Sequence, residues 1–228
     1  SYGFDSSNVF DAALSAGINF VLTAADYQAG KAERAIGQVL KERRKEAVVM
    51  TGWPVRKNTT KAQILEGLDG SLKRLQTDHI DIMRAHNVGD VEEIIHPALF
   101  EAFDEAKKAK KVKCLGFSSH NMRNLDQLIA AAIESGKFDV LMFKYNYIEG
   151  SKVEDLIDLA GKKKIGVVAF KVQAGKREKE MPEFSAEGTD LEAARVRWAL
   201  ANPDVTSVIH AFNTFEDIKK GLEIMQKR

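Results

Sequence analysis

The stretch INFVLTAADYQAGKAERAIG, residues 18–37, decides the fold. Its first six residues are mostly apolar, as in a buried strand, and the residues after the loop carry apolar side chains at helical spacing. A tyrosine, Tyr27, lies in the loop between the two. In proteins built from repeated strand–helix units, loops of this kind deliver side chains to an active site.

The same alternation continues along the whole chain. The strand-like runs are residues 18–23, 47–53, 79–86, 112–119, 139–146, 166–172 and 206–212, with amphipathic helical patterns between them. Repeated units of this length imply a parallel sheet with right-handed crossovers. No Gly-x-Gly-x-x-Gly follows a strand, so a doubly wound dinucleotide-binding sheet is unsupported. We predict a single α/β domain over residues 1–228, a (β/α)8 TIM barrel that lacks its first strand in this chain.

Composition narrows the function classes. The chain has 34 Lys plus Arg against 33 Asp plus Glu, a net charge of +1 that gives no overall field for nucleic acid or an anionic membrane. Its single cysteine rules out a disulfide within the chain and indicates a reducing compartment, the cytoplasm. No His, Cys, Asp and Glu cluster has metal-ligand spacing. We expect a small-molecule substrate, no metal, and a monomer or an oligomer of unknown size.

Several segments, in order and at consistent spacing, resemble the aldo-keto reductase family. GINFVLTAADYQAGKAERAIGQVLKERR (17–44) is similar to the family's GINFFDTADxYGxGxSExxLGxALK. SLKRLQTDHIDIMRAH (71–86) is similar to SLxRLxxDYIDLYxxH, and VKCLGFSSHN (112–121) to VRxIGVSN. The resemblance covers nearly the whole chain and implies carbonyl reduction that depends on NADP or NAD.

The resemblance also implies a catalytic tetrad of Asp, Tyr, Lys and His. The tyrosine matches Tyr27 and the histidine matches His86, whereas Leu22 stands at the aspartate position and Gly52 at the lysine position. In the family the tyrosine gives a proton to the carbonyl oxygen, assisted by the lysine paired to the aspartate. With half of the tetrad replaced, we expect the inherited reduction to be impaired or lost. Losing both charges together avoids an unpaired buried charge, and drift and engineering both account for such a change.

Further positions match the family's cofactor contacts. Phe170 matches the aromatic ring that stacks on the nicotinamide, and Thr214 opens a helix with capping-box spacing that could hold a phosphate. The carboxamide contacts match Ser118, Ser119 and Asn121. No Arg or Lys lies beside Thr214 to bind the 2′-phosphate of NADP, so a preference for NADP over NAD is unsupported. Because the tetrad is altered, a protein that uses no cofactor is a further alternative.

A second hypothesis is a redesigned barrel that acts without a cofactor on a small aromatic substrate. We expect an apolar pocket lined by Leu22, Gly52, Trp53, Arg84, Met142, Val172 and Phe212. Within it, Lys144 would form a Schiff base for a retro-aldol reaction, or His86 or His210 would abstract a proton. In the simpler alternative, Lys144 is ion-paired, for instance with Asp26.

Two further expectations complete the hypotheses. Arg84, on an inner strand face, must find an acidic partner or an anion. Residues 173–188 form a long irregular segment after a strand, either a lid or a surface loop. A third hypothesis is a non-catalytic member of the family that binds a nucleotide or a partner protein.

Overall fold

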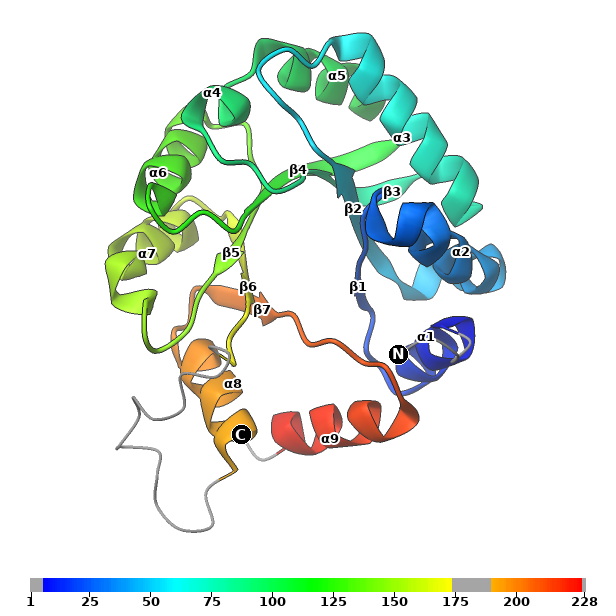
Figure 1. The fold of residues 1–228 in the computed structure, drawn as a ribbon, viewed down its shortest axis with the longest axis vertical. Helices are drawn as coiled ribbons and strands as arrows, with labels where there is room; N and C mark the ends of the chain where they lie inside the picture. The colour runs from blue at the N-terminus through cyan, green and yellow to red at the C-terminus, as the bar shows by residue number, and fades with distance from the viewer. Residues whose placement is uncertain (1–5, 174–189, 227–228) are drawn as a thin grey trace.

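The sheet is parallel, strongly curved and covered by helices on its outer side (Figure 1). The structure is a computed structural model, and it describes residues 6–173 and 190–226. The strands pair in chain order and are β1 (Phe20–Leu22), β2 (Val48–Trp53), β3 (Ile80–Ala85), β4 (Val112–Ser119), β5 (Val140–Lys144), β6 (Gly166–Phe170) and β7 (Val205–Val208). The predicted α/β barrel architecture is confirmed, and in the described ranges its sheet has seven strands. Within the described ranges, β1 and β7 are the two edge strands.

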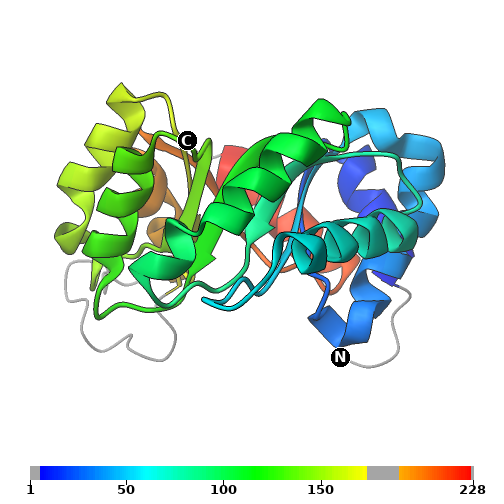
Figure 2. The same ribbon diagram turned by 90° about the horizontal axis from the view of Figure 1, so that it is seen from above.

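Helices follow the strands in the predicted alternation, and Figure 2 shows them outside the sheet from a second direction. The helices are α1 (Ser6–Ser15), α2 (Lys31–Arg43), α3 (Lys61–Leu75), α4 (Val91–Ile94), α5 (Pro97–Lys108), α6 (Leu125–Ser135), α7 (Glu154–Lys162), α8 (Leu191–Ala201) and α9 (Phe215–Gln226). Short 3-10 turns lie at η1 (Tyr27–Gly30), η2 (Arg44–Glu46) and η3 (Gly150–Lys152). Local sequence sets such boundaries: Thr60 and Gln63 form a capping box before α3, and Gln76 ends the helix in a left-handed conformation.

Two apolar layers form the core. The larger layer lies between the sheet and the helices and includes fully buried leucines such as Leu68, Leu99 and Leu128. The smaller layer fills the barrel interior and consists of Met50, Ile82, Met142, Val168 and Phe170. Because successive strand residues point to opposite faces, Gly52 and Arg84, two residues beyond Met50 and Ile82, face the interior at the C-terminal ends of their strands.

Trp53 and Val172 lie outside the interior, contrary to the sequence prediction that they line a pocket there. Both belong to the outer apolar layer. Trp53 follows Gly52 and therefore points to the helices, where its indole packs so closely on Gly67 that an added Cβ would lie 3.0 Å from the ring. Before Val172, Lys171 has a φ of 53°, which breaks the alternation of the strand.

Three remaining expectations concern membrane-spanning helices, metal sites and the lid expected at residues 173–188. No helix within residues 6–173 and 190–226 has the length and apolarity needed to cross a membrane. The same ranges contain no group of three His, Cys, Asp or Glu side chains placed to hold a metal ion. The expected lid lies, beyond Gln173, outside the described residues.

Candidate active site

Tyr27 and His86 lie side by side at the C-terminal ends of the strands. Tyr27 begins η1, shortly after β1, and His86 directly follows β3. Their rings are nearly perpendicular, with centroids 5.5 Å apart. Tyr27 is 38% exposed and His86 is buried, so the phenol lies between solvent and the barrel interior. The structure thus brings together the two residues that the resemblance matches to the family's tyrosine and histidine.

His86 is held in its neutral form. Burial lowers the pKa of His86 from 6.5 to about 4, and the positive charge of Arg84 acts in the same direction. Asp26 opposes this shift, with its Oδ1 3.3 Å from His86 Nδ1, but its side chain is half exposed and its effect is smaller. At neutral pH the imidazole therefore offers one N–H donor and one acceptor nitrogen.

Leu22 and Gly52, at the positions where the resemblance leads us to expect an aspartate and a lysine, carry no ionisable group. Leu22 is partly buried and packs against the interior apolar layer. Gly52 pairs with Arg84 on the neighbouring strand. An added Cβ at position 52 would lie 1.9 Å from the backbone oxygen of Arg84, so any larger residue would require the strands to move apart. The present backbone has no room for a lysine there.

Arg84 is a buried charged residue in register with Gly52. It is 2% exposed. Its Nη1 donates to Ser118 Oγ at 3.1 Å, and its Nη2 donates to the backbone oxygen of Thr23 at 2.8 Å. In the part of the chain that the structure describes, it makes no ion pair, so the acidic partner that the sequence predicts as one alternative is absent.

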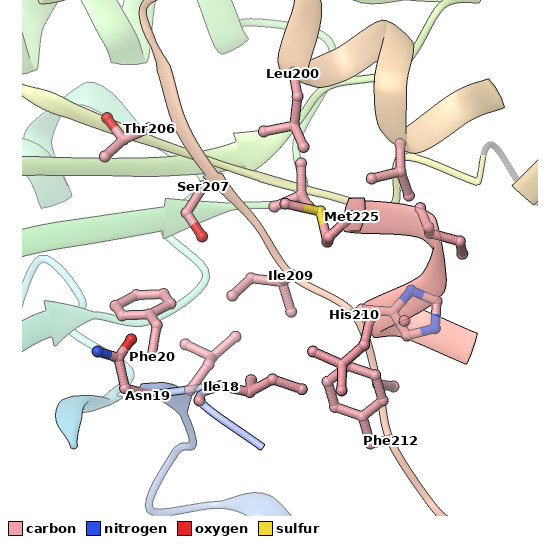
Figure 3. A pocket seen from close by; sticks show the side chains of 18 of the residues that line it. Ile18, Asn19, Phe20, Leu200, Thr206, Ser207, Ile209, His210, Phe212 and Met225 are labelled. Carbon is pink, nitrogen blue, oxygen red and sulfur yellow. The ribbon is translucent and has the colours of Figure 1, made fainter. Parts of the chain in front are cut away.

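A pocket of about 690 Å³ opens between β1 and β7 (Figure 3). Four residues predicted for the site line it, namely Leu22, Tyr27, His210 and Phe212. Its other walls are largely apolar and include Ile18, Phe20, Leu200, Val208, Ile209 and Met225. Gly52, Arg84 and Met142 do not line it. The pocket therefore lies along the open edge of the sheet and reaches the mouth at Tyr27.

The two other predicted catalytic residues have carboxylate partners. Lys144 Nζ contacts Glu149, and not Asp26 as the sequence suggests. His210 Nε2 lies 3.3 Å from Glu192 Oε1, and its ring lies 5.2 Å from that of Phe212. Lys144 is not among the pocket residues, and Glu149 would have to move before Lys144 could attack a carbonyl group.

The residues predicted to contact the carboxamide already have partners in the loops. Ser118 Oγ accepts from Arg84 and from the backbone N–H of Asn87. Ser119 Oγ donates to Val88 and accepts from the backbone N–H of Asn121. These contacts tie the loop after β4 to the loop after β3, so they hold the mouth in shape.

Phe170 retains an aromatic surface, and the helix start at Thr214 is less open. The ring of Phe170 meets that of His120, a residue that the sequence analysis did not select, at a centroid distance of 4.6 Å. Thr214 Oγ1 accepts from the backbone N–H of Asp217, which confirms the predicted capping box. The Asp217 carboxylate accepts the N–H groups of Asn213 and Thr214, so it occupies the donors that a phosphate would need.

Comparison with known proteins matches this arrangement to one family. The Aldo/keto reductase family model matches residues 5–183. An uncharacterized oxidoreductase of Bacillus subtilis, YqkF, is 23% identical over 97% of this chain and 82% of its own length. The Bacillus subtilis aldo-keto reductase YhdN is 29% identical over 79% of this chain and 56% of its own.

Solved structures show the same fold. The holo form of an aldo-keto reductase from Bacillus halodurans has a TM-score of 0.79 at 22% identity, over 98% of this chain and 83% of that one. A Klebsiella pneumoniae aldo-keto reductase in complex with NADPH has a TM-score of 0.76 at 21% identity, over 97% and 80%. The chain belongs to the aldo/keto reductase family.

Proposed function

We propose that this protein binds NADP(H) or NAD(H) and reduces the carbonyl group of a small molecule slowly, because Leu22 and Gly52 replace the charged pair of the tetrad. The observation that carries the proposal is the pair of Tyr27 and His86, whose ring centroids lie 5.5 Å apart at the end of an apolar pocket. Tyr27 supplies the proton, and neutral His86 can donate one hydrogen bond to the carbonyl oxygen.

The residues at the mouth fit the nicotinamide end of the cofactor better than a phosphate. The Phe170 ring offers an aromatic face, and Asn124 Oδ1 is buried without a hydrogen-bond partner and can accept from an amide. At the start of α9, Asp217 already accepts the N–H groups of Asn213 and Thr214. When bound, the cofactor supplies the hydride. The related Klebsiella pneumoniae structure holds NADPH, which supports NADP(H) as the first candidate to test.

Two measurements test the proposal. Titration of NADPH with the protein, followed by cofactor fluorescence, is expected to show binding. NADPH oxidation with a panel of small aldehydes is expected to be slow in the wild type and to disappear in Tyr27→Phe. Tyr147→Phe is the matched control, since it removes a tyrosine hydroxyl that belongs to a different aromatic cluster, next to Trp198.

The outcomes separate the hypotheses. Binding without turnover would favour the non-catalytic nucleotide-binding member of the family. No binding of NADPH or NADH would contradict the proposed function. Turnover that Tyr27→Phe leaves intact would remove Tyr27 from the proton transfer.

A cofactor-free reaction on a small aromatic compound is the second candidate. It is favoured by the apolar pocket, in which His210 lies beside Phe212. His210 is placed to abstract a proton there, with Glu192 orienting its ring. We expect an aromatic ligand to bind the wild type and to bind His210→Gln about equally, with proton exchange lost only in the variant. For the lysine alternative, borohydride trapping with a carbonyl substrate is expected to give no adduct at Lys144, because Glu149 holds its amine outside the pocket.

A further inference from the structure

The pocket between β1 and β7 is a groove that runs along the height of the sheet. Ile18 and Thr206 line it toward the N-terminal ends of the two strands, and Leu22 and Tyr27 line it at the C-terminal end of β1. The stretch from Ile18 to Leu22 spans about 13 Å, at about 3.3 Å per residue of extended chain. The volume of about 690 Å³ lies within the range of small-molecule sites. The groove therefore has room for a molecule that is longer than a single ring.

Two apolar layers face each other across this groove. On one side, Phe20, Leu22 and Ile209 pack against the apolar layer that fills the barrel interior. On the other side, Leu200 of α8 and Met225 of α9 line the groove (Figure 3). Elsewhere in the barrel a strand separates the interior from the helices, but among the described residues no strand lies between β1 and β7. An occupant of the groove would therefore contact apolar side chains on both sides.

The polar side chains of the groove are few and lie mainly toward its two ends. At the N-terminal end, Thr206 Oγ1 already accepts from the backbone N–H of Val167. Tyr27 and His210 lie at the C-terminal end. Between the ends, Ser207 interrupts walls that are otherwise largely apolar. The groove thus fits a molecule that is apolar along its length and polar where it meets Tyr27.

We propose that this groove binds the unbranched aliphatic tail of the substrate, and that the protein reduces long-chain aliphatic aldehydes. The inference rests on the proposed reductase function, because the groove ends at Tyr27, whose ring lies 5.5 Å from that of His86. A straight methylene chain extends along the groove while its aldehyde group lies at Tyr27. The carbonyl carbon receives hydride from NAD(P)H, which is thereby oxidised, and the carbonyl oxygen receives the proton of Tyr27, so the product is the primary alcohol. Solvent then returns a proton to the exposed Tyr27.

Binding of the product alcohols to the protein without cofactor tests the groove independently of turnover. Calorimetric titration is expected to show that n-decanol binds at least about 100-fold more tightly than n-butanol, because each buried methylene contributes about 0.8 kcal/mol, or about fourfold. Ser207→Phe places a ring between the two ends of the groove. It is expected to weaken the binding of n-decanol about 10-fold or more, since two or more methylenes lose their contacts.

The matched control for the blocking variant is Ser151→Phe. It adds the same ring at an exposed serine of η3, which does not line the groove. Its affinity for n-decanol is expected to equal that of the wild type.

A series of straight-chain aldehydes tests the same groove during turnover. From butanal through hexanal to octanal, the KM for the aldehyde at saturating NADPH is expected to fall about two- to fourfold for each added methylene. The value of kcat is expected to change little, because the tail binds equally in the ground state and in the transition state. In Ser207→Phe, the KM for octanal is expected to rise about 10-fold or more toward the value for butanal.

Failure of this inference is distinct from failure of the proposed function. A KM that does not change from butanal to octanal, with turnover that Tyr27→Phe abolishes, would overturn the tail assignment and leave the reductase function intact. Binding of n-decanol that Ser207→Phe weakens, without turnover of any aldehyde, would support the groove and contradict the reductase function. If Ser207→Phe does not fold, Leu200→Trp narrows the groove from α8 and gives the same comparison. Binding of n-decanol that neither variant weakens would overturn the inference.

Discussion

The neutral state of His86 predicts a loss of stability in mild acid. The pKa of His86 is lowered to about 4 in the folded chain, from an ordinary value of 6.5. The unfolded chain therefore takes up a proton at a pH at which the folded chain does not. Its contribution to stability is fully present above about pH 6.5 and is lost as the pH falls toward 4. At about 1.4 kcal/mol per pH unit, the lowered pKa is worth about 3 kcal/mol. Of this, about 2 kcal/mol is lost by pH 4.5, just above the lowered pKa.

Urea unfolding at pH 7.5 and at pH 4.5 measures this effect. Between the two pH values, we expect the free energy of unfolding of the wild type to fall by about 2 kcal/mol more than that of His86→Gln. The glutamine keeps a polar side chain but does not titrate. The other four histidines and all carboxylates are present in both proteins, so the difference isolates His86. Parallel losses in the two proteins would show that the folded protein does not hold the imidazole neutral.

Three substitutions elsewhere test the packing that supports the site. Glu33→Ala is expected to lower the free energy of unfolding in urea by about 3–5 kcal/mol. The fully buried Glu33 carboxylate lies 2.6 Å from Arg74 Nε, and its removal leaves the charge of Arg74 unpaired. A loss below about 1 kcal/mol would contradict this. Gly52→Ala is expected to lower stability by about 1–3 kcal/mol and to lower Tm, because its Cβ would lie 1.9 Å from a backbone oxygen of β3; an unchanged Tm would show that the strands separate freely. Thr214→Ala removes the acceptor for the backbone N–H of Asp217 and is expected to lower stability by about 1 kcal/mol in the same unfolding measurement; an equal loss in Thr214→Ser, which keeps the hydroxyl, would show that the cap is not the cause.

The sequence predicts the strands well because each carries its own signal. The run at 112–119 has the bounds of β4, the run at 47–53 begins one residue before β2, and the run at 79–86 extends one residue beyond each end of β3. The run at 206–212 is the least accurate, since β7 ends at Val208. Edge strands have only one neighbour, so pairing rather than composition decides where they end.

The side-chain partners in the site depend on distances that the sequence does not contain. Because successive residues of a strand point to opposite faces of the sheet, Trp53 and Gly52 could not both face the interior. The prediction that both line the same pocket overlooked this rule. The partner of Lys144 is Glu149, five residues away across a loop, and no periodicity predicts this pairing. Glu192 comes from α8 and reaches His210 only because the barrel brings the two segments together.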